Sequence, residues 1–299
     1  MGMLLRDLNC VTCGSANYSI RYEARLPDIE HLNFSARRPG QHYHPRIVVC
    51  QECGQIFSNP YFTDHVIVDL YRTAKYISEP QLGNMTADYL REFEAALGNR
   101  PKYELRVLEV GCASGFFLDA LRKRGYRSLQ GIEPGEEAVS LSAKEIRPHI
   151  RNEFFGPDSF AAGSFDVVCC FQVMDHMPNP AAFAQAVYKV LAEGGLFLTV
   201  NHDIRAPITR LLGERSPMYD IEHIYLFDQS TIQRLFRNAG FSVLACRSLY
   251  NSYTLDYALK MFPLPSPLKT AAARLLSALG LADLSIRVPG GNMVTVGHK

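Results

Sequence analysis

The sequence lacks a charge excess, a long uncharged apolar run and a leader-like start. Its 299 residues carry 31 Lys and Arg against 30 Asp and Glu. A net charge of +1 argues against an extended nucleic-acid surface, which usually needs a basic excess. No apolar stretch reaches the roughly 18–20 residues of a membrane span, and MGMLLRDLNC has neither the apolar core nor the cleavage site of a signal peptide. We therefore expect a cytoplasmic protein without a transmembrane segment or nucleic-acid partner.

Internal repeats and low-complexity tracts are also missing, whereas hydrophobic residues make up 47% of the chain. That length and composition suit one large domain, or one domain with a small module. Helical periodicity runs over 64–98, and Pro80 and Gly83 are expected to divide it into two helices. Strands are then expected at 105–110, 128–133, 165–171, 195–201, 241–248 and 291–297, and helices at 115–125, 135–147, 180–192 and 228–239. This alternation predicts an α/β fold with a parallel sheet covered on both faces.

Four of the eight cysteines form two CxxC pairs near the N-terminus. Cys10 and Cys13 are followed by Gly14, and Cys50 and Cys53 are followed by Gly54. Four thiolates suit tetrahedral zinc, and the glycines allow the turns that point backbone N–H groups at sulfur. Two disulfides or a redox pair are the alternatives, and a reducing cytoplasm disfavours disulfides. We predict a structural zinc ribbon over 1–62, in which the metal substitutes for a large core.

A glycine-containing turn, VLEVGCASGFF, follows the strand expected at 105–110 and opens a helix. It does not fit the GxxxxGK[ST] loop, because no lysine stands at the helix start. It does not fit GxGxxG either, because Ala113 and Phe116 occupy glycine positions of that pattern. Glu109, at the end of the strand, is unsuited to a pyrophosphate but suits a cation such as an ammonium group.

The next expected strand ends in GIEP, where Glu133 is placed to accept hydrogen bonds from two ribose hydroxyls. The ligand should therefore have a ribose, an amino-acid-like cation and no phosphate. S-adenosylmethionine has all three features. A dinucleotide fold with a degraded fingerprint is the alternative.

Five segments in order resemble the motifs of class I S-adenosylmethionine-dependent methyltransferases. They are VLEVGCASGFFLDAL, GIEP, FDVVCCFQVMDHMPNP, VLAEGGLFLTVN and LFRNAGF, and GGNMVTVGHK resembles the last strand of that family. The resemblance implies a Rossmann-like sheet of seven strands with the last antiparallel, over 63–299. Within that domain we expect N-terminal helices at 63–100, a lid insertion at 203–222 and a C-terminal insertion at 260–290.

The same resemblance assigns residues to the cofactor. It places Glu133 at the ribose and Pro134 beside the adenine. At the methionine end of the cofactor it places Glu109, Gly111, Cys112, Ala113, Gly115 and Phe116. After the fourth strand it adds Phe171, Gln172 and Val173 as residues that line the cofactor. The family usually has glycine where this chain has Ala113. Alanine can be accommodated there if its φ stays negative.

A narrower resemblance is to zinc-ribbon methyltransferases of sugar metabolism, including those that act on nucleotide-linked deoxysugars. Glu222 and His223 match a Glu-His pair of those enzymes, His176 matches a histidine after the fourth strand, and Tyr76 resembles an N-terminal tyrosine that reaches the site. Asp220 and Ile221 stand where those enzymes have tyrosine and histidine. The resemblance implies a small-molecule acceptor, such as a nucleotide-linked sugar or glycan-pathway metabolite.

Methyl transfer needs the acceptor aligned with the activated methyl group and, for a hydroxyl or enolisable carbon, a base. Histidine suits that role, so His223 and His176 are the candidate bases and His202 is a third. The open alternatives are an RNA or protein methyltransferase whose zinc ribbon grips a macromolecule, and a non-catalytic scaffold. We expect a monomer or a homodimer.

Overall fold

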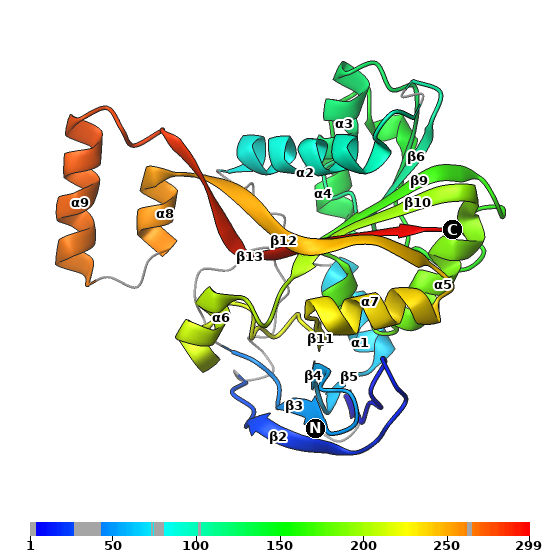
Figure 1. Ribbon diagram of the computed structural model, residues 1–299, viewed down its shortest axis with the longest axis horizontal. Helices are drawn as coiled ribbons and strands as arrows, with labels where there is room; N and C mark the ends of the chain where they lie inside the picture. The colour runs from blue at the N-terminus through cyan, green and yellow to red at the C-terminus, as the bar shows by residue number, and fades with distance from the viewer. Residues whose placement is uncertain (1–3, 27–42, 73, 75–80, 101–102, 262–264) are drawn as a thin grey trace.

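The computed structural model describes residues 4–26, 43–72, 74, 81–100, 103–261 and 265–299. A seven-stranded sheet lies at its centre, in the order β12-β13-β10-β9-β6-β7-β8 (Figure 1). The strands are β6 Arg106–Val110, β7 Ser128–Ile132, β8 Ile150–Arg151, β9 Phe165–Phe171, β10 Leu191–His202, β12 Ser242–Thr254 and β13 Ser285–His298. The five strands from β8 to β10 are parallel, and β13 pairs antiparallel with both β10 and β12. The predicted α/β sheet is therefore confirmed.

Helices cover both faces of this sheet, as the alternation predicts. One face carries α2 Leu82–Leu97 and α3 Phe116–Lys123, and the other carries α5 Pro180–Val190 and α7 Gln229–Asn238. Neighbouring residues of one strand alternate between the two cores: Cys169 packs on the α2–α3 side and Cys170 on the α5–α7 side. Both thiols are fully buried, which is how small hydrophobic side chains behave.

Some expected boundaries are wrong. Gly83 lies inside α2 instead of breaking it, and the helix expected at 135–147 is divided into α4 Glu136–Ser140 and the 3₁₀ turn η2 Arg147–His149. The short strand β8 is absent from the expected strands because two residues carry no periodicity. Tyr76 and the rest of 75–80 lie outside the described residues. Among the residues that the structure does describe, no helix has the length and apolar character to cross a membrane.

The N-terminal module, residues 4–26 and 43–62, contributes β1 Leu5–Arg6, β2 Tyr18–Tyr22, β3 Ile47–Cys50, β4 Ile56–Ser58 and β5 Tyr61–Phe62. Strands β2, β3 and β4 form an antiparallel sheet whose fourth strand, β11 Tyr225–Leu226, comes from the distant part of the chain. Helix α1, Asp64–Arg72, leads from the module toward the central sheet. The module is thus joined to the segment that directly follows Glu222 and His223.

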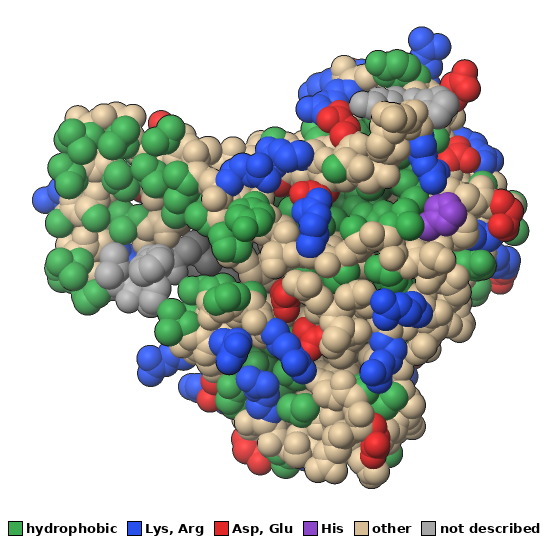
Figure 2. Space-filling model, in the orientation of Figure 1, with side chains coloured by type: hydrophobic (Ala, Val, Ile, Leu, Met, Phe, Trp, Pro, Cys, Tyr) green, Lys and Arg blue, Asp and Glu red, His purple; other side chains and the backbone are tan. Residues whose placement is uncertain are grey.

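The second half of the chain also builds a projecting arm. Strands β12 and β13 continue past the central sheet and carry α8 Leu255–Met261 and α9 Ser266–Ala278. Separately from this arm, the insertion expected at 203–222 contains two short helical elements, α6 Pro207–Leu212 and η4 Gly213–Arg215. No residue of α9 is buried, and its lobe at the left of Figure 2 is largely apolar at the surface.

Candidate functional site

The turn between β6 and α3 brings its two glycines into positions that only glycine fills. Gly111 has φ +72° and Gly115 has φ +68°. A Cβ on Gly111 would lie 2.4 Å from Val173 Cγ2, and a Cβ on Gly115 would lie 2.6 Å from Ile146 Cγ2. The left-handed conformation and the close approach both require glycine. The turn is therefore packed against Val173, a residue assigned to the cofactor from the sequence.

Ala113, between those glycines, has φ +48°, whereas the sequence analysis expects a negative φ. That expectation is wrong, since Ala113 lies in the left-handed region together with Gly111 and Gly115 on either side of it. A left-handed alanine costs about 1–2 kcal/mol. The chain keeps this strain at the point where the family usually has glycine.

Glu133 lies directly across the turn. Its Oε2 accepts the Ala113 N–H at 3.0 Å, and its Oε1 accepts the Gly135 N–H at 2.8 Å. Burial raises the pKa of Glu133, although those two N–H donors oppose the shift. Each carboxylate oxygen keeps acceptor capacity for a further donor. The position of Glu133 fits a carboxylate that accepts hydrogen bonds from ribose hydroxyls.

Glu109, at the end of β6, is 2% exposed, and its Oε2 has no hydrogen-bond partner among the described residues. Burial raises its pKa well above the usual range, and the Glu133 charge adds to this effect. A buried carboxylate without a donor calls for a cation. The ammonium end of S-adenosylmethionine supplies such a donor, so the residues present fit this cofactor.

The other residues assigned to the cofactor surround the same edge. Gln172 follows β9 with φ +57°, and Phe171 stacks on Tyr89 with ring centroids 4.3 Å apart. Cys112 is fully buried, Phe116 begins α3, and Pro134 directly follows Glu133. The structure therefore gathers the assigned residues around the carboxyl ends of β6, β7 and β9.

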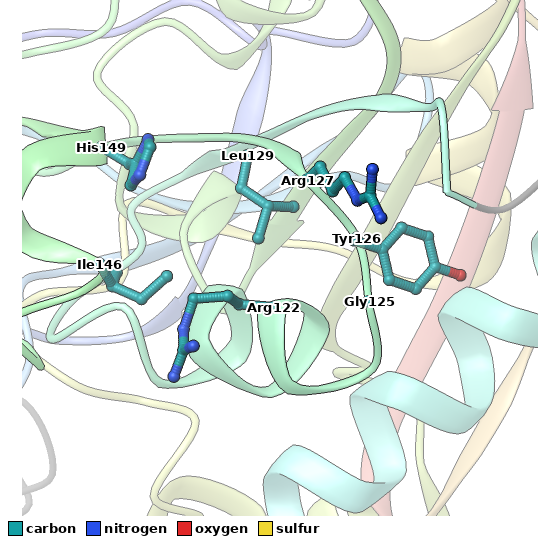
Figure 3. Close-up of a pocket in the computed structure, with 7 residues that line it drawn as sticks. All are labelled: Arg122, Gly125, Tyr126, Arg127, Leu129, Ile146 and His149. Carbon is teal, nitrogen blue, oxygen red and sulfur yellow. The ribbon is translucent and has the colours of Figure 1, made fainter.

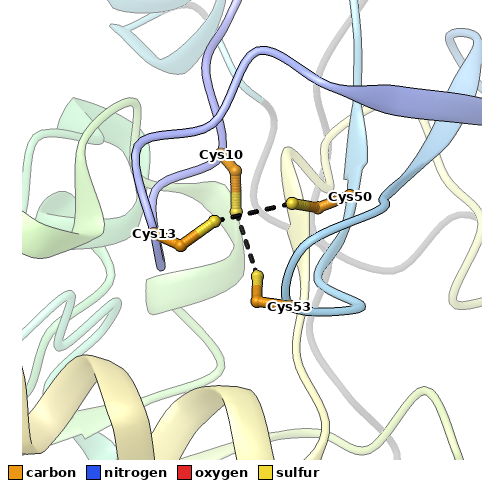
Figure 4. Close-up of side chains that lie close together, drawn as sticks. All are labelled: Cys10, Cys13, Cys50 and Cys53. Atoms are coloured by element: carbon orange, nitrogen blue, oxygen red, sulfur yellow. Dashed lines mark hydrogen bonds between the residues drawn. The ribbon is translucent and has the colours of Figure 1, made fainter.

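The four N-terminal cysteines meet at one point (Figure 4). Their Sγ atoms all lie within 4.8 Å of one another, with Cys10 to Cys53 at 3.4 Å and Cys13 to Cys50 at 3.5 Å. These separations are too long for disulfides. Four sulfurs around a zinc ion at about 2.3 Å would lie somewhat under 4 Å apart. The cluster therefore fits zinc.

A second cluster of titratable side chains lies where β9 and β10 end. Asp175 and His176 belong to the turn η3 Met174–His176, His202 ends β10, and His223 precedes β11. The ring centroids of His176 and His202 lie 4.8 and 5.1 Å from that of His223. These four residues are called the histidine–aspartate cluster below.

Asp175 occupies the middle of this cluster. Its Oδ1 lies 3.8 Å from His176 Nε2, and its Oδ2 lies 3.8 Å from His223 Nε2 and 4.0 Å from His202 Nε2. Glu222 borders the cluster, with Oε2 3.9 Å from His176 Nδ1. Two sequence-predicted residues, His176 and His223, are thus neighbours across one carboxylate.

Burial and charge act differently on the members of the cluster. Burial is the largest influence on His176 and takes its pKa to about 4, although the Asp175 carboxylate opposes it. Burial also lowers the pKa of His223, but Asp175 and Asp220 outweigh it, and the net pKa is raised. For Asp175, burial raises the pKa, but the three histidines outweigh burial and the net pKa is lowered.

The N-terminal module holds the backbone around His223. Ser58 Oγ donates to the His223 carbonyl at 2.9 Å, the Ser58 N–H donates to the Ile224 carbonyl at 2.8 Å, and Tyr61 Oη donates to the Ile221 carbonyl at 2.7 Å. Three backbone carbonyls of this loop, between Ile221 and Ile224, are therefore held by the module. The pairing of β4 with β11 brings Ser58 to this loop, and Tyr61 reaches it from β5.

Sequence reasoning missed Asp175 as a member of the site. Its signal is present, because an acid stands directly before His176 in MDHMPNP. Tyr71 was missed as well; its ring centroid lies 6.3 Å from that of His176, on the helix that leads to Tyr76.

A cavity of about 320 Å³ lies elsewhere (Figure 3). Arg122, Arg127 and His149 line it, together with Leu129 near the start of β7. It therefore lies at the opposite strand ends from Glu133, and Arg122 is already paired with Asp119 at 2.9 Å. This cavity is separate from the glycine-containing turn between β6 and α3, which is called the cofactor turn below.

Comparison with known proteins agrees with this arrangement. A family model described as a methyltransferase domain matches residues 82–245, more than half of the chain. The chain is similar to ubiquinone biosynthesis O-methyltransferases of Psychrobacter arcticus, with 32% identity over 44% of this chain and 52% of that protein, and of Paracidovorax citrulli, with 30% identity over 54% and 74%. The chain thus spans about half the length of the first of these relatives.

Two solved structures share the fold. One is a chain of the complex between the Haloferax volcanii Trm112 methyltransferase activator and a methyltransferase described as putative, with a TM-score of 0.51, 18% identity and coverage of 74% of this chain and 94% of that one. The other, from Bacillus halodurans, carries the same description, with a TM-score of 0.50, 16% identity and coverage of 71% and 99%. The family match confirms the predicted family: the chain belongs to the class I S-adenosylmethionine-dependent methyltransferases.

Proposed function

We propose that the protein transfers a methyl group from S-adenosylmethionine to a small-molecule acceptor, and that a histidine of the histidine–aspartate cluster takes the proton of the acceptor. The observation that carries this proposal is the position of the cluster. It follows β9 and β10 at their carboxyl ends, beside the cofactor turn, where α/β sheets of this kind bind ligands.

When bound, S-adenosylmethionine supplies a methyl group on a positively charged sulfur, which leaves as a neutral thioether. The chain would contribute in three ways when the cofactor is bound. Glu109 would hold the ammonium end, Glu133 would accept hydrogen bonds from the ribose hydroxyls, and the cluster would offer an imidazole nitrogen to the proton of the acceptor. General base catalysis by a positioned histidine typically contributes about 10²–10⁴-fold.

The acceptor class we propose is a small molecule with a hydroxyl group, such as a nucleotide-linked sugar or glycan-pathway metabolite. The Glu222–His223 pair and the N-terminal cysteine module support a sugar-type acceptor through their resemblance to the sugar enzymes. The names of the O-methyltransferase relatives support a hydroxyl as the methylated group. Phenols of low molecular mass therefore belong in the same acceptor panel.

The test measures release of S-adenosylhomocysteine with a panel of nucleotide-linked sugars and small phenols. His176→Gln and His223→Gln should lower the turnover with the best acceptor by about 10²–10⁴-fold. Cofactor affinity, measured by calorimetry, should stay within about twofold. The exposed His149, which lies outside the cluster, gives the matched control His149→Gln. Turnover unchanged in these two cluster variants and in His202→Gln would refute the proposed role of the cluster.

A further inference from the structure

We propose that Asp175, His176 and His223 bind a divalent first-row transition-metal cation, at a site separate from the cysteine cluster. The binding itself does not depend on the proposed function. The catalytic role drawn from it below does rest on that function.

The first argument is geometric. One ligand atom from each of Asp175, His176 and His223 lies within 4.8 Å of the others. His176 Nε2 lies 3.8 Å from Asp175 Oδ1, and His223 Nε2 lies 3.8 Å from Asp175 Oδ2. Ligands at about 2.0–2.2 Å from one ion lie roughly 3.0–3.5 Å apart. Modest rotations of the three side chains would bring these atoms to coordination distance; at present the two histidines approach different oxygens of Asp175.

The second argument is that the buried carboxylate of Asp175 has no hydrogen-bond donor. This carboxylate is 2% exposed, and neither of its oxygens has a hydrogen-bond partner among the described residues. A buried carboxylate without donors is costly unless it is paired or coordinates a metal. The nearest histidine nitrogens lie 3.8 Å away, beyond hydrogen-bond distance, so a small cation between them and the carboxylate would satisfy both oxygens.

The third argument is the tautomer of His223. Its Nδ1 lies 2.9 Å from the Met218 carbonyl oxygen. Because a carbonyl only accepts, the proton must sit on Nδ1, and the neutral ring then turns the Nε2 lone pair toward Asp175. Metal-binding histidines usually donate their second N–H to a carbonyl or carboxylate in this way. The ring is therefore oriented as a metal ligand.

The ligand set indicates the class of cation. Two imidazoles and one carboxylate suit Fe²⁺, Mn²⁺, Co²⁺, Ni²⁺ or Zn²⁺ better than Mg²⁺ or Ca²⁺, which prefer oxygen ligands. The cysteine cluster offers four sulfurs and no nitrogen. The two sites of one chain thus differ in ligand chemistry.

His202 is left as the proton acceptor. Its Nδ1 lies 2.8 Å from Asn292 Oδ1, and the Asn292 amide is fixed by a bond from its Nδ2 to Asn251 Oδ1. The His202 proton therefore sits on Nδ1, and its side chain is 29% exposed against 9% for His223. A cation on the other three residues would lower the pKa of an acceptor hydroxyl, and His202 Nε2 would take the proton.

The experiment is calorimetric titration of Co²⁺ into the full-length protein that carries one zinc ion per chain, held by the four thiolates of the cysteine cluster, so that the second site is left for cobalt. Zinc resists displacement there because it binds more tightly than cobalt. The wild type should bind one Co²⁺ per chain. Asp175→Asn, His176→Gln and His223→Gln should each bind it at least about tenfold more weakly. His202→Gln and the control His149→Gln should bind it as the wild type does.

Two results would overturn the inference: no Co²⁺ bound by the wild type, or equal binding by the wild type and all three ligand variants. Thermal unfolding and cofactor binding of each variant show whether it is folded, and three separate ligand variants keep the test decisive if one of them is not. Methyl transfer by a protein that binds no Co²⁺ would leave the proposed function standing, with a histidine acting as the base by itself.

Discussion

At the scale of single residues, the two carboxylates of Glu109 and Glu133 have different proposed roles in the cofactor site. Glu133 already bridges the glycine turn and the segment that follows β7, whereas Glu109 lacks a donor within the described residues. Both positions could be predicted from the sequence, because an acid at the carboxyl end of a parallel strand lies at the edge of the sheet where ligands bind. Their separate hydrogen-bond states could not, since these depend on how two loops approach each other.

Glu133→Ala should weaken cofactor binding by roughly tenfold or more, because hydrogen bonds to charged groups contribute about 1.5–3 kcal/mol. The measurement is calorimetry with S-adenosylmethionine. Glu136→Ala, at an exposed position of α4, is the matched control and should bind as the wild type does. Equal affinities for the two variants would refute the assignment of Glu133 to the ribose.

Ala113→Gly should stabilise the fold by about 1 kcal/mol, since it relieves a left-handed alanine at φ +48°. The measurement is the free energy of unfolding in denaturant. The control Ala120→Gly lies within α3, where glycine should instead destabilise by about 1 kcal/mol. A destabilised Ala113→Gly variant would show that this turn has another conformation.

At the scale of elements, the N-terminal module and the loop before β11 act as one unit. Gln55 links them further: its amide donates to the Leu226 carbonyl at 3.0 Å, and its Oε1 accepts from Thr12 Oγ1, within the first cysteine pair, at 3.0 Å. A chain of hydrogen bonds therefore runs from the cysteine cluster to the strand that follows His223. The sequence could not reveal this, because β4 and β11 are paired across more than 160 residues.

Tyr61→Phe should destabilise the protein by about 1–3 kcal/mol, because it leaves the buried Ile221 carbonyl without its donor. Turnover should fall while cofactor affinity is kept, since the loop that carries His223 loses an anchor and the cofactor turn does not. Unfolding, turnover and calorimetry are the three measurements. Tyr103→Phe, at an exposed ring, should change none of them; a Tyr61→Phe variant equally unaffected would contradict the anchoring role.

At the scale of the whole molecule, more of the fold than of the site could be predicted from the sequence. Strand–helix alternation and the ordered motifs sufficed for the central sheet, because these signals are local. The arm formed by β12, β13, α8 and α9 was foreseen only as an insertion, since strands that extend beyond a sheet have no separate pattern. Asp175 escaped prediction because its importance arises when η3, β10 and the loop before β11 converge.

Cys50→Ser should release the metal of the cysteine cluster and loosen the N-terminal module, whose small core depends on it. Elemental analysis should find the zinc content of this site lost, and turnover should fall more than cofactor affinity, because the module anchors the loop of His223. Cys246→Ser, outside the cluster, is the control. An unchanged zinc content in Cys50→Ser would contradict the four-thiolate site.

The central claim is methyl transfer to a small molecule, and one measurement tests it most directly. Purified protein and methyl-labelled S-adenosylmethionine are incubated with an extract of the source cell, which is then separated into small molecules, RNA and protein. The account predicts label in the small-molecule fraction, and loss of that label with His223→Gln. Label confined to RNA or protein would contradict the account and indicate that the cysteine module grips a macromolecule.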